Sequence, residues 1–259
     1  MNYALVTGAS KGIGKAIAYE LAARRFNILL VARSADLLQD IAADINNRFE
    51  VATDYLAADL SNPAAAINIL EWCNRNNFNV RALINNAGYG LSGAFEKYSA
   101  ADYQNMMELN MVSLVSMTHH FLPMLKKNEQ AYIMNIASTA SYQSVPGLSV
   151  YAASKSFVLN FSRAIHIELK NTNVSVTCVS PGGTNTDFGN RANISKKGNA
   201  IAAKVNMTSE TVASKAVKGM LNKKTEVITG GINKLGVFIA WLLPKKIVEN
   251  GAASIYLAD

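Results

Sequence analysis

A tyrosine and a lysine stand four residues apart in the segment YAASK, in which Tyr151 carries a phenol and Lys155 an ammonium group. This spacing places both side chains on one face of a helix. A phenol held beside a substrate can act as a general acid or base. Many surface helices carry such a pair without any chemistry, so the remaining motifs must decide between a catalytic pair and an exposed helix edge.

A glycine-rich segment near the N-terminus, TGASKGIG, supplies a second group of candidates. It joins an apolar segment typical of a strand to a periodic segment typical of a helix. There Gly8, Gly12 and Gly14 permit a tight turn and a close approach of the backbone to a pyrophosphate, which the helix N-terminus then faces. The spacing is GxxxGxG, which departs from the GxGxxG of the longer dehydrogenases. On this motif alone, a plain glycine turn remains the alternative.

Strands and helices alternate along the chain and predict how these motifs are positioned. The expected strands are YALVT, NILLVA, ATDYLAAD, RALINNAG, AYIMNIAS and VSVTCVS. Helical periodicity lies between them, over the longest stretches at 100–126 and 150–170. This alternation predicts an α/β fold: a doubly wound parallel sheet of the Rossmann type, in three layers with helices on both faces. Neither a repeat nor a linker divides the chain, so 1–259 is expected to form a single domain.

Five motifs then come in the order of a known enzyme family: TGASKGIG, NNAG at 85–88, Ser138, YAASK and PGG at 181–183. Together they resemble the short-chain dehydrogenase/reductases, from residue 2 to about 186 and more weakly beyond. The nearest resemblance is to NADP-dependent carbonyl reductases and 3-oxoacyl reductase-like members. It implies an oxidoreductase that transfers a hydride between a nicotinamide and a carbonyl or secondary alcohol.

The resemblance implies a catalytic set of Asn110, Ser138, Tyr151 and Lys155. Tyr151 is the general acid or base, and the neighbouring ammonium of Lys155 is expected to lower the pKa of its phenol. Lys155 also holds the nicotinamide ribose, and Ser138 polarises the substrate oxygen. Asn110 orders a water in a proton relay. For Asn110 a kink or a packing detail in the long helix is the alternative.

The end of the second strand indicates which dinucleotide binds. An NAD site places a carboxylate on the ribose hydroxyls, whereas the segment LLVARS at the end of this strand carries no acid and has Arg33 near its tip instead. Arg33 and Lys11, with the hydroxyls of Ser10 and Ser34, suit a 2′-phosphate, and in the family this pattern implies NADP(H). The alternatives are that both cations are solvated surface charges, or that Asp36 reaches the ribose.

The resemblance assigns further residues to the cofactor. Asp59 would bond the adenine edge, although it could also cap the following helix, and Asn85 is expected to brace the sheet. Gly183 departs from the bulkier residue usual at its position. The predicted cofactor contacts are Gly8, Ser10, Lys11, Gly12, Ile13, Gly14, Arg33, Ser34, Asp59, Leu60, Asn86, Ala87, Gly88, Tyr151, Lys155, Pro181, Gly182, Thr184 and Thr186.

The polar stretch at about 184–209 is predicted to be a substrate loop or lid, with a disordered surface loop as the alternative. It would wall the substrate pocket together with 89–98 and 139–148. The side chains expected there favour an apolar carbonyl or alcohol. They are Leu91, Phe95, Val145, Leu148 and Phe188.

The amino-acid composition limits the kinds of ligand and partner that the protein is expected to bind. The net charge of +7 comes from scattered lysine pairs and not from a basic block, which argues against nucleic acid and suits a phosphorylated ligand. The two cysteines and three histidines form no metal-binding motif, so no metal is expected. The N-terminus resembles no signal peptide, which favours a reducing, cytoplasmic location.

The most apolar stretch, 235–244, is too short to cross a bilayer. The expected order is a core helix first, a subunit contact second and an interfacial anchor third. Contact with a membrane through 235–246 is therefore possible but not expected. The family usually pairs its long helices, so a homodimer or homotetramer is predicted. Two alternative functions stay open: a peripheral membrane-associated reductase of lipid-derived carbonyls, and a catalytically silent, cofactor-binding regulator.

Overall fold

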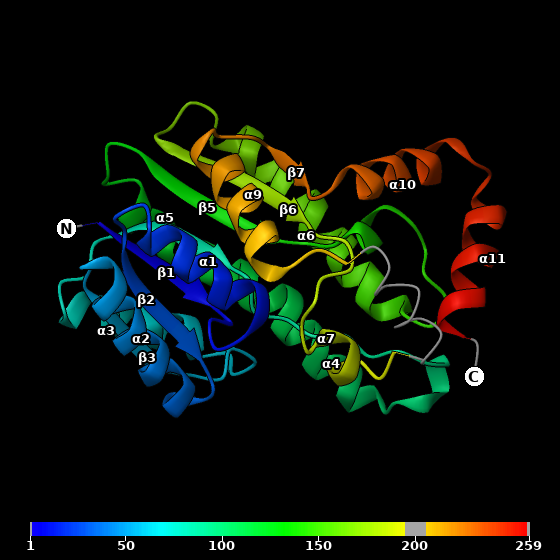
Figure 1. Cartoon of the computed structure of the whole chain (residues 1–259), viewed down its shortest axis with the longest axis horizontal. Coiled ribbons are helices and arrows are strands. Elements are labelled where there is room, and N and C mark those ends of the chain that lie inside the picture. Colours follow the sequence, from blue (N-terminus) through cyan, green and yellow to red (C-terminus); the bar gives the residue numbers. More distant parts are fainter. Residues whose placement is uncertain (1, 195–205, 258–259) are drawn as a thin grey trace.

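The computed structural model describes residues 2–194 and 206–257 and contains a seven-stranded parallel sheet of order β3-β2-β1-β4-β5-β6-β7. The chain starts at β1, winds out to β3 and returns past β1 to β4, as Figure 1 shows. The strands are β1 Tyr3–Thr7, β2 Asn27–Ala32, β3 Thr53–Ala57, β4 Val80–Asn85, β5 Ala131–Ile136, β6 Val174–Ser180 and β7 Glu226–Ile228. The predicted doubly wound α/β fold is thereby confirmed; β7 was not predicted because three residues carry too little pattern.

Helices cover both faces of the sheet. One face carries α1 Gly12–Ala22, α2 Ala35–Phe49 and α9 Ser209–Leu221; the other carries α3 Ala65–Arg75, α5 Ser113–Leu125 and α6 Ser149–Glu168. Neighbouring strand residues face opposite sides, so Val6 packs in the first core and Leu5 in the second. Because both sides are buried, apolar residues occupy consecutive positions in the central strands and not only alternate ones.

The predicted long helix at 100–126 is interrupted. It consists of α4 Ala100–Met107, a π-helical segment Glu108–Val112, and α5. The wider turn coincides with Asn110, whose buried side chain bonds to the backbone of Tyr89 instead of facing solvent. A π-helical insertion of this kind is frequent at functional sites.

The C-terminal helices α10 Gly231–Leu242 and α11 Lys245–Tyr256 lie at one end of the molecule, beyond the sheet (Figure 1). The expectation that 235–244 is a core helix is wrong, because α10 packs on the protein with one side only and leaves Trp241 72% exposed. None of the helices in the described residues has both the length and the apolar character to cross a bilayer.

The predicted substrate loop at 184–209 contains a short helix, α7 Phe188–Arg191. Two backbone hydrogen bonds join the two ends of the predicted loop. Asn185 N donates to Met207 O (2.9 Å), and Met207 N donates to Gly183 O (3.0 Å). Residues 195–205 of the predicted loop lie outside the described residues.

Candidate active site

A cavity of about 910 Å³ runs along the carboxyl ends of the strands, from the glycine loop to Tyr151. It crosses the switch point between β1 and β4, where ligands bind in open α/β sheets. All the predicted cofactor contacts line this cavity, as does Ser138. Of the predicted site residues, Asn110 alone is absent from the lining.

The glycine loop closes only because its key positions lack side chains. Gly8 has φ +64° and Gly12 φ +55°, a conformation that other residues rarely adopt. A Cβ at Gly14 would lie 2.3 Å from the Gly8 carbonyl oxygen and 2.3 Å from Asn86 Nδ2. Lys11 precedes α1 without a side-chain cap, so the N–H groups of the first turn stay available. This cradle fits the pyrophosphate of a dinucleotide.

Asn85 and Asn86 fix the sheet and the loop from β4. The Asn86 side-chain amide donates to the carbonyl oxygens of Thr7 (2.9 Å) and Gly8 (3.2 Å). Asn85 Nδ2 donates to Thr118 Oγ1 (3.1 Å) and to Asn135 Oδ1 (2.9 Å), which confirms that it braces the sheet. Asn86 therefore holds the cradle in shape in addition to lining the cavity.

Exposed cations stand at the glycine-loop end of the cavity, where Arg33 and Lys11 both line it. Asp59 lies close by. Hydrogen bonds from the main-chain N–H and the hydroxyl of Ser61 hold the pKa of Asp59 below its ordinary value, and the charge of Arg33 adds to them. Asp59 does not cap α3, whose N-cap is Ala64, because its carboxylate is taken up by Ser61.

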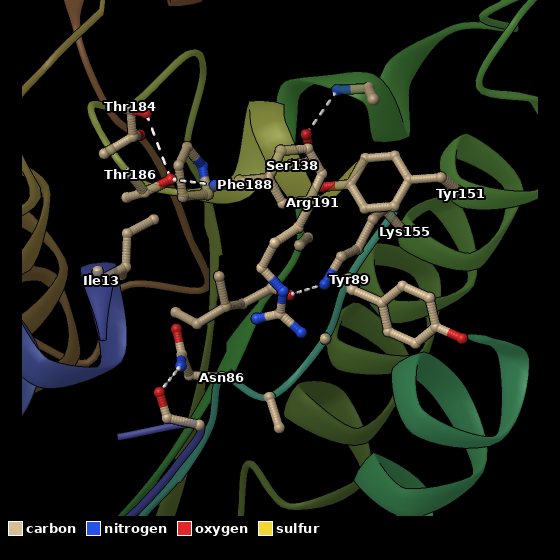
Figure 2. Close-up of a pocket in the computed structure, with 18 of the residues that line it drawn as sticks. Ile13, Asn86, Tyr89, Ser138, Tyr151, Lys155, Thr184, Thr186, Phe188 and Arg191 are labelled. Atoms are coloured by element: carbon tan, nitrogen blue, oxygen red, sulfur yellow. Dashed lines mark hydrogen bonds between the residues drawn. The ribbon is translucent and has the colours of Figure 1, made fainter. Parts of the chain in front are cut away.

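The reactive groups meet at the opposite end, where the Tyr151 side chain points toward Ser138 (Figure 2). The Ser138 hydroxyl faces the phenol and acts to lower its pKa, and it accepts a hydrogen bond from Ala140 N (3.1 Å). Ser138 lies two residues beyond the end of β5, and Tyr151 lies in the first turn of α6. Phe188 covers the tyrosine ring, with the two ring centroids 5.2 Å apart.

The expected effect of Lys155 on the phenol is wrong for this arrangement. Burial raises the pKa of Tyr151 to about 12, and the bond from Ser138 opposes this rise. The ammonium lies 5.9 Å from the tyrosine ring centroid and donates to the carbonyl oxygen of Ile136 (2.9 Å). Burial also lowers the pKa of Lys155 to about 8. At neutral pH the phenol is therefore protonated, and most of the lysine is charged.

Asn110 is held by protein groups. Its Nδ2 donates to Tyr89 O (2.9 Å) and Ser154 Oγ (3.1 Å), and its Oδ1 accepts from Tyr89 N (3.1 Å). The packing alternative accounts for these contacts, because they fix the chain just beyond Gly88. A role in ordering a relay water stays a prediction.

The substrate end of the cavity differs in part from the prediction. Val145, Leu148 and Phe188 line it, whereas Leu91 and Phe95 do not. Phe95 instead stacks on Tyr103, with ring centroids 5.2 Å apart. The sequence analysis did not single out one group of lining residues, although two of them, Tyr89 and Arg191, fall within the predicted walls 89–98 and 184–209. The group is Tyr89, Arg191, Ile232, Asn233, Gly236, Val237, Ala240 and Tyr256.

Arg191 is the one charged side chain in that group, and it extends into the cavity from α7 (Figure 2). It fell within the predicted loop at 184–209, but a polar stretch without periodicity gave no sign of which side chains face inward. Its guanidinium offers an anion-binding group near the Ser138 and Tyr151 end.

Comparisons with known proteins agree with this geometry. Residues 2–197 match the family described as short chain dehydrogenase. The chain belongs to the short-chain dehydrogenase/reductase family. Members of this family are oxidoreductases that act on alcohol or carbonyl groups with NAD(P)(H), and this chain carries their fold and their cofactor cradle.

Relatives in the family include named reductases. The chain is 34% identical to the very-long-chain 3-oxoacyl-CoA reductase of Bos taurus, over 70% of this chain and 58% of that protein. It is 31% identical to the NADP-dependent 3-hydroxy acid dehydrogenase of Schizosaccharomyces pombe, over 71% and 72%. The structure of a short-chain dehydrogenase from Sphingobium yanoikuyae in complex with NADPH is 28% identical, with a TM-score of 0.82 over 100% and 98%. Several curated relatives are matched over only 55% to 58% of their length.

Proposed function

We propose that the protein is an NADP(H)-dependent reductase of an apolar carbonyl compound, with Tyr151 as its general acid. One observation carries this proposal: a single cavity joins a glycine cradle at one end to Ser138 and Tyr151, which face each other, at the other (Figure 2). Two relatives named for NADP or bound to NADPH support the choice of cofactor.

Each part of the cavity has a task in this proposal. The glycine loop and the α1 N-terminus hold the pyrophosphate, and Arg33 with Lys11 binds the 2′-phosphate. Lys155 holds the nicotinamide ribose, while Asn86 keeps the cradle in shape through the carbonyls of the loop. When bound, the cofactor supplies the hydride.

The protonated phenol gives a direction to the proton chemistry. A phenol with a pKa of about 12 keeps its proton at neutral pH. It can therefore donate that proton to a carbonyl oxygen that gains negative charge during reduction. Ser138 donates a second hydrogen bond to the same oxygen and stabilises the developing charge. The reverse oxidation would need the phenolate, which burial disfavours.

The substrate class follows from the lining. Val145, Leu148, Phe188 and Val237 give the substrate end an apolar wall.

A screen of aldehydes and ketones of increasing chain length with NADPH is expected to give turnover that improves with the apolar size of the substrate. Turnover of any carbonyl excludes the silent-regulator alternative. Complete inactivity across the screen, with NADPH bound, would favour it.

Arg33 is expected to set the preference for NADPH. A charge-assisted hydrogen bond contributes about 1.5–3 kcal/mol, or roughly one to two powers of ten in affinity. Arg33→Ala should therefore raise the KM for NADPH at least tenfold and leave the KM for NADH nearly unchanged. The measurement is kcat/KM for both cofactors at one fixed ionic strength, because low salt exaggerates exposed charges.

Arg48 offers a matched control for this substitution. It is an exposed arginine on α2 that pairs with Asp44 and does not line the cavity. Arg48→Ala should leave both KM values as in the parent. Equal efficiency of the parent with NADH and NADPH would contradict the assignment of Arg33, whatever its variant does.

We also propose that two copies pair through the π-helical segment, α5 and α6. A mostly apolar groove lies there, with Val112 and Phe157 exposed. Its lining is Met111, Val112, Val115, Ser116, His119, His120 and Phe157. A helix surface that is apolar and exposed marks an association site.

Light scattering is expected to give a dimer or tetramer at micromolar concentration, and Phe157→Glu should shift the equilibrium between oligomer and monomer toward the monomer. A parent that stays monomeric contradicts the pairing.

A further inference from the structure

The C-terminal helices α10 and α11 present the largest group of exposed apolar side chains in the described part of the chain. Nine of the fifteen large exposed hydrophobic residues there belong to 232–257. They are Ile232, Leu235, Phe238, Ile239, Trp241, Leu242, Leu243, Ile247 and Leu257. Large exposed apolar side chains that gather in one segment mark a binding surface. We name these nine residues the C-terminal apolar face.

Helix α10 is apolar on nearly all sides. Its inner side, with Gly236, Val237 and Ala240, lines the active-site cavity. Its outer side carries Phe238, 55% exposed, and Trp241, 72% exposed. A helix that is apolar all round is normally buried on all sides. The described chain covers only the inner side of α10. We therefore expect the exposed apolar side chains of the outer side to contact an apolar surface outside the described chain.

Three lysines lie on the same two helices as this face. Lys234, Lys245 and Lys246 are all exposed, and Glu249, which is half-buried, is the only acidic residue of α10 and α11. Tryptophan with lysines at its border is typical of a segment lying in the boundary between lipid headgroups and acyl chains. Helix α10, with 12 residues, is about 18 Å long, so it suits a position along the surface of a bilayer.

We propose that the C-terminal apolar face docks the protein onto an anionic lipid bilayer. This reverses the order expected from the sequence, in which an interfacial anchor came last for 235–244. A position at the membrane surface accounts for both the exposed apolar side chains and the exposed lysines. The acyl region would surround Trp241 and Phe238, while anionic headgroups would attract the three lysines.

A second copy of the chain fits the charges less well. In a two-fold contact the same patch meets itself. The lysines at the border of one patch would then lie near the same lysines of the partner, and like charges across a contact are unfavourable. An anionic bilayer places opposite charge against all of them.

The position of α10 links this surface to the cavity. Ile232 belongs to the C-terminal apolar face and also lines the cavity, so the bilayer side of α10 and the substrate end adjoin. Resting on the proposed function, this arrangement implies a substrate that partitions into lipid, such as a long-chain or polycyclic carbonyl. The docking itself can be tested without cofactor or substrate, so its failure and the failure of the proposed function are distinguishable.

The test is sedimentation of the full chain with phosphatidylcholine vesicles, with and without phosphatidylserine. Binding to the anionic vesicles is expected, at least tenfold tighter than to neutral ones and weakened by salt. The chain has two tryptophans. In a Trp72→Phe background the emission of Trp241 should shift to the blue on binding and be quenched by brominated lipid.

Substitutions on these helices distinguish the contribution of the apolar side chains to vesicle binding from that of the lysines. Phe238→Ser with Trp241→Ser should reduce binding to anionic vesicles at least tenfold, while Ile167→Ser, at a 60% exposed site on α6, should not. Lys234→Gln with Lys246→Gln should weaken it about twenty-five-fold, since each lysine near an anionic surface contributes a factor of about five.

A second pair of lysines controls for net charge. Lys126→Gln with Lys127→Gln removes the same charge from an exposed site after α5 and should leave vesicle binding within about twofold. The proposal is overturned if the parent does not bind anionic vesicles, or if Phe238→Ser with Trp241→Ser binds them as the parent does. It is also overturned if these two substitutions dissociate an oligomer that does not bind vesicles.

Discussion

Replacement of Tyr151 by phenylalanine is expected to lower kcat by about two to four powers of ten, the usual contribution of a general acid. The substitution keeps the ring that packs against Phe188 and removes only the phenol oxygen that faces Ser138. Since Lys155 keeps its bond to Ile136 O, NADPH should bind within about threefold of the parent. Steady-state turnover and a direct NADPH titration measure the two effects separately.

Tyr103→Phe is the matched control for this loss. Tyr103 is buried in the same hydrophobic cluster as Tyr151, but its hydroxyl donates to Phe95 O (2.9 Å) and it does not line the cavity. Its variant should keep kcat within a few-fold of the parent. If Tyr151→Phe turned over at more than about a tenth of the parent rate, the phenol would not be the proton donor.

The sequence predicted most accurately the features that depend on local pattern. Alternation of strand and helix determined the sheet and its layers, and the glycine loop was found because only glycine suits its turn. Asn85 was assigned to the sheet from its place at the end of β4, where it bonds Thr118 and Asn135. Such assignments succeed because neighbours along the chain decide the conformation.

The features that were missed depend on contacts between distant segments. The side chain of Asn110 in the π-helical segment bonds the backbone of Tyr89, which lies in the distant loop after β4. The rise in the pKa of Tyr151 depends on how deeply α6 and the C-terminal residues bury the phenol, which spacing from Lys155 does not show. Helix α10 was assigned to the core because a pattern that is apolar all round does not reveal which side the protein covers.

The cofactor cradle shows how such distant contacts act on function. Gly14 lies at the start of α1, yet the space beside it is filled by Asn86, which follows β4, and by the Gly8 carbonyl oxygen. Asn86 in turn donates to that same carbonyl. Because Gly14 has no Cβ, α1 can approach the glycine loop and the end of β4 closely. The position of the α1 N-terminus depends on this close approach.

Gly14→Ala is accordingly expected to disrupt both stability and cofactor binding. Within a helix, alanine is favoured over glycine by up to about 1 kcal/mol. Here its Cβ would lie 2.3 Å from the Gly8 carbonyl oxygen and from Asn86 Nδ2. Overpacking of this kind costs about 1–3 kcal/mol, and the backbone oxygen cannot move aside as a flexible side chain can. We expect a net loss of about 1–2 kcal/mol in the free energy of unfolding and an NADPH affinity at least a hundredfold lower.

Gly251→Ala makes the same chemical change where there is room for it. Gly251 lies within α11, exposed, and a Cβ there would meet nothing within 4 Å. The free energy of unfolding should rise by up to about 1 kcal/mol, as helix propensity alone requires, and NADPH affinity should not change. Urea unfolding and NADPH titration of both variants provide the comparison. A Gly14→Ala protein as stable as its Gly251→Ala counterpart, with NADPH bound as tightly, would show that the close approach of α1 to the loop is not what forms the cofactor site.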